Sequence, residues 1–175
     1  RIGGVANDIN DDTLKMLRKW LNHFAVELRR FEALVNRNRI FVERLAGVGY
    51  MPPEKAIALG LTGPCLRGSG IARDLRRDEP YLLYNELDFD VITNNDCDVW
   101  GRYLVRVTEM KESMKILHQL LDKPKTGDFM LDDAKNVLPG KSQIYTKMEE
   151  LISDFMLVNF GAMPPKGETY TAIES

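Results

Sequence analysis

The chain has 175 residues, of which 44% are hydrophobic and 29% charged, with 13 Gly and 8 Pro. This composition excludes collagen-like, low-complexity and wholly disordered chains, and the length suits a single domain over residues 1–175. The formal charge of −2 gives no reason to expect a nucleic-acid partner, and two cysteines are too few for a disulfide framework or a structural zinc site.

Two features of the sequence concern membrane spans and the length of the parent chain. Its apolar runs are short and are broken by Gly and Pro, so we expect no direct membrane span. The start at Arg1 and the strand-like pattern of residues 170–175 predict that the sequence is a piece of a longer chain.

The first third of the chain predicts helices. Residues 10–12 offer side-chain acceptors that suit the start of a helix. Trp20, Val26 and Ala33 broaden the apolar face of that helix, which favours packing within a bundle over a two-stranded coiled coil. The main stripe steps by three and four, as an amphipathic helix requires: Leu14, Leu17, Leu21, Phe24, Leu28, Phe31 and Val35. Shorter helices are predicted over residues 38–46 and 54–59.

The middle of the chain predicts irregular structure. Three glycines and a proline within residues 62–71 favour a shaped loop over regular structure. A short helical turn is expected to end at Tyr84. Residues 87–92 then alternate apolar and acidic side chains, a pattern typical of a short edge strand or an extended loop.

The second half predicts two more helices. Asp98 is expected to cap a long helix that ends before Pro124, with an apolar face made of Tyr103, Val107, Met110, Met114, Leu117 and Leu121. A polar connector follows, with a possible short strand at residues 129–131. Ser142 is expected to cap a final helix whose apolar face holds Ile144, Met148, Leu151, Ile152 and Phe155. The elements together predict a mainly α protein, a helical bundle with short strands and shaped loops.

Four arginines are the strongest charged cluster: Arg67, Arg73, Arg76 and Arg77. Guanidinium groups can grip a carboxylate or a phosphate. However, Asp74, Asp78 and Glu79 lie among them and nearly neutralise the cluster. We therefore predict an internal salt-bridge lattice that holds the loop between helices, rather than a ligand site.

Other chemically active residues favour ordinary roles. Gly68 and Gly70 lack the third glycine and the strand–loop–helix context of a dinucleotide site. His23 and His118 are predicted to pack on helices, and Cys65 and Cys97 to be free thiols in loops. No metal site and no catalytic set is predicted within these residues, so any chemistry of the parent protein is shared with other segments or subunits.

A series of motifs, in order from end to end, resembles the D subunit of NADH:quinone oxidoreductase (respiratory complex I), called the 49 kDa subunit in mitochondria. The motifs are RIGGV at 1–5, TGPCLRGSGI at 62–71, DLRRDEPY at 74–81, DFDV at 88–91, RYLVR at 102–106, Glu109-Met110, MEELI at 148–152 and GETYTAIE at 167–174. The resemblance implies the middle-to-late part of that subunit, with the mainly helical fold of nickel–iron (NiFe) hydrogenase large subunits.

The resemblance also implies a function. The subunit would belong to the peripheral arm of a proton-translocating complex, on the cytoplasmic side of the plasma membrane or the matrix or stroma side in an organelle. Quinone would be the substrate at a shared site, while NADH and the iron–sulfur clusters are carried by other subunits and this chain binds no cofactor alone. Its partners would be the membrane arm and a small cluster-bearing subunit, with which it forms the quinone pocket.

The residues that the family credits with protonating quinone, a His and a Tyr, belong to an earlier segment. The nearest pocket element is the loop of Arg1, Gly3, Gly4 and Val5, which resembles a family turn near the terminal cluster and the quinone pocket. Its glycines would let the backbone approach a partner or a cofactor closely.

Two departures from the family pattern limit what carries over. Cys97 stands before Asp98 where the family usually has Gly, so the local turn is expected to differ. Residues 153–154 are Ser-Asp where a pair of histidines often stands, so no role resting on those histidines is expected here.

Two alternatives stay open. A membrane-bound group-four NiFe hydrogenase large subunit shares the Arg-Gly-Ser-Gly and Asp-Leu-Arg patterns, and would hold nickel with Cys-X-X-Cys pairs before Arg1 and after Ser175. A helical scaffold or interaction module without enzymatic activity is the other hypothesis. The sequence leaves the quinone type and the electron donor undecided.

Overall fold

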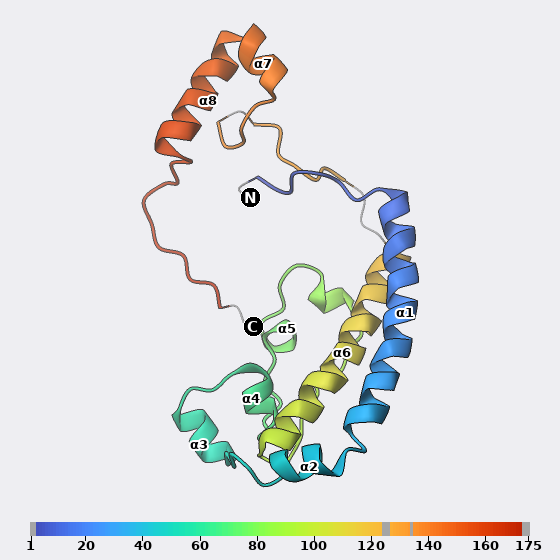
Figure 1. The fold of residues 1–175 in the computed structure, drawn as a ribbon. Coiled ribbons are helices and arrows are strands. Elements are labelled where there is room, and N and C mark those ends of the chain that lie inside the picture. The colour runs from blue at the N-terminus through green and yellow to red at the C-terminus, as the bar shows by residue number, and fades with distance from the viewer. Residues whose placement is uncertain (1–2, 124–126, 134, 173–175) are drawn as a thin grey trace. The chain divides into compact units, whose positions relative to one another are not determined.

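The computed structural model describes residues 3–123, 127–133 and 135–172, which fall into two compact units (Figure 1). One unit comprises the described residues of 12–124 and 171–175, and the other those of 1–11 and 125–170. The described structure is mainly helical, which confirms the predicted mainly α class. The NiFe hydrogenase type of fold, and a single domain over residues 1–175, stay predictions.

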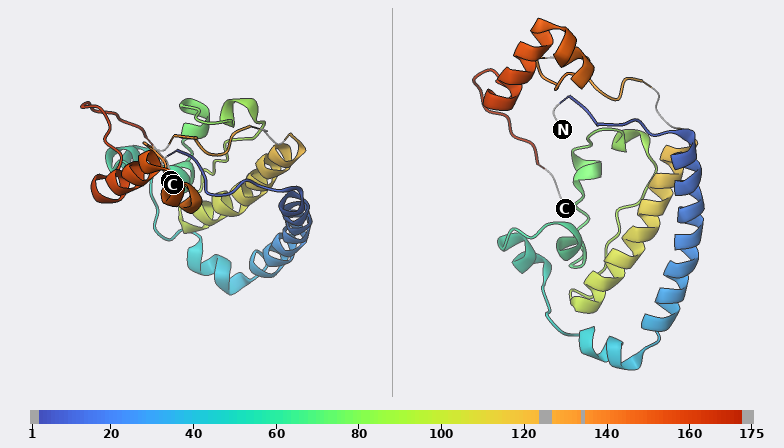
Figure 2. Two further views of the ribbon diagram at one scale, coloured as in Figure 1. Left: turned by 90° about the horizontal axis from the view of Figure 1, so that it is seen from above. Right: turned by 45° about the horizontal axis from the view of Figure 1, so that its top comes forward.

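Two long antiparallel helices form the frame of the larger unit: α1, Asp11–Val35, and α6, Val99–Asp122. They lie side by side in both figures of the fold (Figures 1 and 2). Polar bonds join them near both ends, since Arg18 Nη1 lies 2.7 Å from Asp122 Oδ1 and Tyr103 donates from its hydroxyl to Asn36 Oδ1 at 2.7 Å. Leu21 and Leu28 are the buried residues of α1 and lie on its predicted stripe.

Short helices connect these two: α2, Arg39–Leu45; α3, Pro53–Ala58; α4, Gly63–Arg67; α5, Leu75–Asp78; and the 3-10 turn η1, Tyr84–Glu86. Asn38 caps α2 by accepting from the amides of Ile40 and Phe41. The core of the unit lies where α4 and the following loop pack on α6, and its buried side chains include Leu66, Leu75, Phe89, Val105, Val107 and Ile116.

Asp98 anchors the start of α6. Its Oδ1 accepts from the amide of Gly101 at 2.8 Å, as predicted for a helix cap, and its Oδ2 accepts from the amide of Gly47 at 2.6 Å. Backbone bonds from Val99 to Val48 and from Met51 to the carbonyl of Cys97 lie beside it. The end of α2 is therefore fixed to the beginning of α6.

The smaller unit contains α7, Lys141–Thr146, and α8, Met148–Phe160, which pack on each other. An isolated antiparallel bridge joins Gly4 to Met130. None of the residues of α8, all of which the structure describes, is buried. None of the helices in the described ranges is long and apolar enough to span a membrane.

Several predicted elements differ in the structure. Residues 62–71 contain the helix α4, so the prediction of a loop without regular structure was wrong there, and Cys65 lies in this helix. Residues 87–92 are extended but form no strand, because the amides of Asp88 and Asp90 donate to side chains of α6, Gln119 and Glu112, instead of to a neighbouring strand.

The C-terminal predictions also need correction. The final helix is two helices, because Lys147 has an extended backbone (φ −125, ψ 126), and α7 begins at Lys141 after Gly140 rather than after a Ser142 cap. The short strand at residues 129–131 is reduced to the single bridge at Met130. Residues 170–172 form no strand, and residues 173–175 lie outside the described residues.

Candidate functional site

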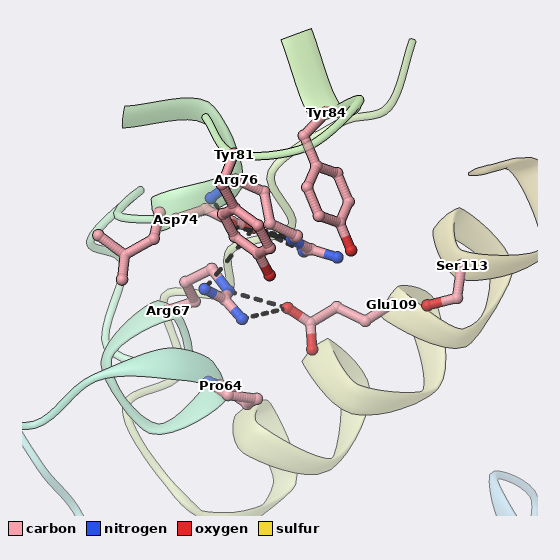
Figure 3. Close-up of a pocket in the computed structure, with 9 residues that line it drawn as sticks. Pro64, Arg67, Asp74, Arg76, Tyr81, Tyr84, Glu109 and Ser113 are labelled. Carbon is pink, nitrogen blue, oxygen red and sulfur yellow. Dashed lines mark hydrogen bonds and ion pairs between the residues drawn. The ribbon is translucent and has the colours of Figure 1, made fainter. Parts of the chain in front are cut away.

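A polar cavity of about 250 Å³ lies in the larger unit, between α4, α5, the residues leading into η1, and α6. Its polar lining consists of Arg67, Asp74, Arg76, Tyr81, Tyr84, Glu109 and Ser113. Arg76 of α5 and Tyr84 of η1 point toward Glu109 and Ser113 of α6 (Figure 3). The cavity therefore lies between segments that are more than thirty positions apart in sequence, and the Arg67–Glu109 bond joins two of them.

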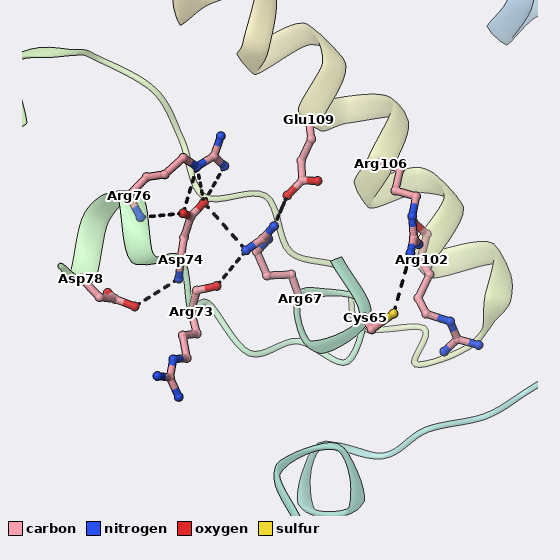
Figure 4. Close-up of polar contacts among 9 residues, drawn as sticks. All are labelled: Cys65, Arg67, Arg73, Asp74, Arg76, Asp78, Arg102, Arg106 and Glu109. Carbon is pink, nitrogen blue, oxygen red and sulfur yellow. Dashed lines mark hydrogen bonds and ion pairs between the residues drawn. The ribbon is translucent and has the colours of Figure 1, made fainter. Parts of the chain in front are cut away.

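Arg67 is the centre of the charge network. Its side chain is only 6% exposed, and its Nε and Nη2 lie 2.8 Å and 2.6 Å from Glu109 Oε1 (Figure 4). Its Nη1 donates to the carbonyl of Arg73 at 2.9 Å and lies 3.8 Å from Asp74 Oδ2. A buried guanidinium requires such partners, because a charge without them would be strongly destabilising.

Asp74 is the second anion of the network. Its carboxylate accepts from Arg76 Nη2 at 2.6 Å and from the Arg76 amide at 3.0 Å, which also caps α5. Burial raises the pKa of the Asp74 carboxyl, but the hydrogen bonds from Arg76 and the charges of Arg76 and Arg67 outweigh burial, so the pKa lies below 3.8. Asp74 is therefore an anion at neutral pH.

Two aromatic residues, Tyr81 and Tyr84, line the cavity, and a third, Phe89, packs on Arg76 and Tyr84. The guanidinium groups of Arg76 and Arg77 lie 5.1 Å and 4.2 Å from the centre of the buried Phe89 ring, and Arg77 also donates to the Phe89 carbonyl. Tyr84 packs edge-to-face with Phe89 and with Tyr81. Burial, with a smaller effect of Tyr81, raises the pKa of the Tyr84 hydroxyl.

The structure thus brings together three of the four arginine side chains named from the sequence. Arg67 and Arg76 share Asp74, and Arg76 and Arg77 share Phe89, whereas Arg73 contributes its carbonyl oxygen to Arg67. Asp78 accepts from the Asp74 amide at 3.1 Å. That this network holds the loop between the helices, rather than binding a ligand, stays a prediction.

Sequence reasoning missed Glu109 as the main partner of Arg67. The acids near the arginines in sequence are Asp74, Asp78 and Glu79, whereas Glu109 is 42 positions from Arg67. The available signal was an acid one position before Met110 of the predicted apolar face, because an acid at the edge of a buried face needs a cation.

The glycine loop proposed near the quinone pocket lies in the smaller unit. Gly3 and Gly4 have φ values of 84° and 124°, which side-chain-bearing residues rarely adopt. A Cβ on Gly3 would lie 2.2 Å from Val137 Cγ2, and one on Gly4 would lie 2.4 Å from the Phe129 carbonyl oxygen. The glycines thus allow close approach to residues of this chain itself. Val5 is 57% exposed, and Arg1 lies outside the described residues.

The remaining candidates are separate from the cavity. His23 is exposed on α1, and His118 is half-buried on α6. Both cysteines are free thiols, as predicted, and Cys65 Sγ lies 3.7 Å from Arg106 Nη2. Among the described residues, no group of three or more His, Cys, Asp or Glu could hold a metal ion.

Comparison with known proteins places the chain in a family. The family described as "Respiratory-chain NADH dehydrogenase, 49 Kd subunit" matches residues 1–175. The chain is 47% identical over 175 residues to the NADH-quinone oxidoreductase D 1 subunit of Chloroherpeton thalassium, covering 100% of this chain and 40% of that protein. The chain belongs to this 49 Kd subunit family.

Further relatives are the same subunit of NADH-quinone oxidoreductase. The D subunit of Salinibacter ruber is 47% identical over 175 residues, covering 99% of this chain and 39% of the relative. The D 2 subunit of Rhizobium etli is 42% identical over 176 residues, covering 100% of this chain and 44% of the relative. The chain therefore spans about two-fifths of the length of these relatives.

Proposed function

We propose that the chain is part of the D subunit of a proton-translocating NADH-quinone oxidoreductase, in which electrons from NADH reach quinone through iron–sulfur clusters on other subunits. The observation that carries this proposal is the family match over residues 1–175, together with relatives of that name at 47% identity. The subunit would lie in the peripheral arm, on the cytoplasmic side of the membrane, beside a small cluster-bearing subunit and the membrane arm.

The role proposed for this part of the subunit is to form a wall of the quinone site. A wall element needs a fixed backbone. The loop of Gly3, Gly4 and Val5 has one, since the Val5 amide donates to the Phe129 carbonyl at 3.0 Å and the Leu131 amide donates to the Gly3 carbonyl at 2.7 Å. Because residues 129–131 and 137 fill the space beside the glycines, the exposed Val5 side chain is the part of the loop that would contact quinone.

A substitution in the full-length subunit within its assembled complex tests this role. Val5→Trp is expected to raise the KM for quinone, while oxidation of NADH with ferricyanide is unchanged because that acceptor takes electrons before the quinone site. Ile9→Trp is the matched control, since Ile9 is equally exposed and lies just outside the loop. Equal quinone kinetics of the two variants would contradict the wall role, and hydrogen evolution by the purified complex would contradict the proposed complex itself.

A further inference from the structure

One side of α1 is apolar and largely uncovered. Leu17, Phe24 and Phe31 recur every seven residues and therefore follow one line along the helix, which we call the α1 stripe. Leu17 and Phe31 are 38% and 45% exposed. Trp20 stacks on Phe24 with ring centres 5.0 Å apart and is 53% exposed. The apolar face of α1 is thus wider than the part of it that is buried.

The helix α6 has a matching line of side chains. Tyr103, Met110 and Leu117 also recur every seven residues and form the α6 stripe, in which Met110 and Leu117 are 42% and 43% exposed. The buried Val105 and Ile116 lie roughly a third of a turn away from this stripe around the helix. The α6 stripe is therefore separate from the face of α6 that packs in the core.

The two stripes lie on the same side of the helix pair. Glu32 pairs with Lys111 at 2.7 Å and Arg18 pairs with Asp122 at 2.7 Å, so these residues mark the facing sides of the two helices. On each helix the stripe lies roughly a quarter turn from the facing side, in the same rotational sense along the chain. Because the helices are antiparallel, this places both stripes on one side, where they form a single apolar surface within the larger unit.

The spacing and length of this surface fit one α-helix. A spacing of seven residues on both stripes is what two helices of a left-handed bundle present to a third, whose side chains insert between theirs. From Leu17 to Phe31 the α1 stripe is roughly 21 Å long, which corresponds to about four turns of helix. An extended segment would leave its backbone amides without partners against an apolar surface, whereas a helix satisfies them internally.

The burial of α1 indicates that the covering helix belongs to the same polypeptide. Of the 25 residues of α1, all of them described, only Leu21 and Leu28 are buried. A helix in water gains most of its stability from the packing of its apolar face. The helix α1 therefore needs a further partner while its own polypeptide folds, before subunits associate. About three-fifths of the length of the curated relatives lies outside the part matched by this chain and is long enough to supply that partner.

We propose that the surface made by the α1 stripe and the α6 stripe binds one amphipathic helix from the part of the D subunit outside residues 1–175. This inference rests on the proposed function, which makes the chain one part of that longer subunit. The bound helix has apolar residues at seven-residue intervals, and it buries Trp20 together with both stripes.

Photo-crosslinking in the purified complex tests the identity of the covering segment. The full-length subunit is made with p-benzoylphenylalanine in place of Phe31 or, as the matched control, in place of Asn22, which is exposed on the other side of α1. We expect irradiation of the Phe31 variant to form a crosslink within the subunit, to one helical peptide outside residues 1–175, and the Asn22 variant not to form it. A crosslink to another subunit or to a peptide of residues 1–175, an adduct of lipid mass, the same crosslink from both positions, or no crosslinked peptide would overturn the proposal.

Thiol labelling tests the same surface without a bulky probe. Met110→Cys introduces a thiol on the α6 stripe, and Asn22→Cys introduces one on the opposite side of α1. In the folded complex we expect loss of maleimide labelling at position 110 but not at position 22, and labelling of both positions after denaturation. Equal labelling of the two positions in the folded complex would overturn the proposal.

The two proposals fail separately. If the unsubstituted full-length protein co-purifies with no NADH-quinone oxidoreductase, the proposed function fails. If it co-purifies with that complex and position 110 is nevertheless labelled, only the proposal of a covering helix fails.

Discussion

Arg67 and Glu109 form a largely buried ion pair in the larger unit, with Nε and Nη2 of the arginine 2.8 Å and 2.6 Å from the same carboxylate oxygen, Oε1. The pair joins the last residue of α4 to the middle of α6. Because Arg67 also donates to the Arg73 carbonyl, it fixes the backbone next to Asp74. We therefore expect the shape of the polar cavity to depend on this pair.

Arg67→Lys tests the pair. A lysine lacks the fork of donors that reaches Glu109 and the Arg73 carbonyl together, so we expect the free energy of unfolding to fall by about 2 kcal/mol. Denaturant unfolding of the full-length protein measures the change. If the network is a lattice for folding, the KM for quinone stays the same in the folded fraction.

Arg39→Lys is the matched control for that experiment. Arg39 pairs with Glu43 at 2.6 Å, but both side chains are exposed, 88% and 61%. Exposed pairs of this kind contribute under about 1 kcal/mol. Equal losses of stability in the two variants would show that burial of Arg67 does not matter.

Asp74 predicts a pH dependence of stability. Its pKa in the folded protein is lower than the ordinary value of 3.8, so the unfolded chain binds the proton more tightly. The stabilisation is present above the unfolded pKa and is lost as the pH falls from about 4 through the folded pKa. In the Asp74→Asn variant, the free energy of unfolding should therefore fall less steeply as the pH decreases. A fall as steep as in the unsubstituted protein would show that Asp74 is not the cause of the acid dependence.

Asp98→Ala tests the junction of α2 and α6. The substitution removes the acceptor for two amides, Gly101 and Gly47, and we expect a loss of about 2 kcal/mol. Asn38→Ala removes an exposed cap from α2 and should have about half that effect. Faster hydrogen exchange at Gly47 as well as Gly101 would show that both bonds are lost.

Gly4→Ala tests the glycine loop. The added Cβ would meet the Phe129 carbonyl oxygen at 2.4 Å, at a φ of 124° that alanine disfavours. We expect the pairing with residues 129–131 to open, so that the amides of Val5 and Leu131 exchange faster. Gly167→Ala should leave exchange unchanged, because no atom lies within 4 Å of its added Cβ. Protection at Val5 in the Gly4 variant would contradict the observed packing.

Residues 1–175 expressed alone should oligomerise or aggregate. The helix α8 exposes apolar residues around its surface, among them Ile152, Phe155, Val158 and Phe160 at 56–68%. A surface of this kind is typical of an interface that another segment covers. Light scattering measures the effect. A sharp melting transition of a monomer, independent of concentration, would contradict the expectation and favour the self-sufficient scaffold.

Sequence alone predicted the bounds of the long helices well, because caps and breaks are local signals. The predicted buried face of α6 was partly wrong, since Val105 and Ile116 are buried whereas Met110 and Leu117 are 42% and 43% exposed. Asp98 caps α6 as expected, and α1 begins at Asp11 within the predicted residues 10–12. The break at Lys147 was missed because residues 141–160 contain no Pro or Gly to mark it. The helix α4 was missed because Gly63 and Pro64, which usually indicate a loop, are at its first turn, where proline is tolerated.

The site was harder to predict than the helices. The arginine cluster was visible in the sequence, but its partner Glu109 and the ring of Phe89 come from distant segments. The departure at Cys97 was visible as well. Its φ of 58° lies in the left-handed region, which favours glycine, and the Cys97 side chain is buried.

The hydrogen bonds around Asp98 also have a consequence for how this chain tolerates changes in length. They close residues 48–99 at the base, with Val99 bonded to Val48 at 3.0 Å and Met51 bonded to Cys97 at 2.6 Å. Doubling the length of a closed flexible loop adds only about 0.6 kcal/mol of entropy cost. No atom lies within 4 Å of a Cβ added at Gly60. Extra residues inserted there would therefore lengthen the closed segment and leave the hydrogen bonds at its base intact.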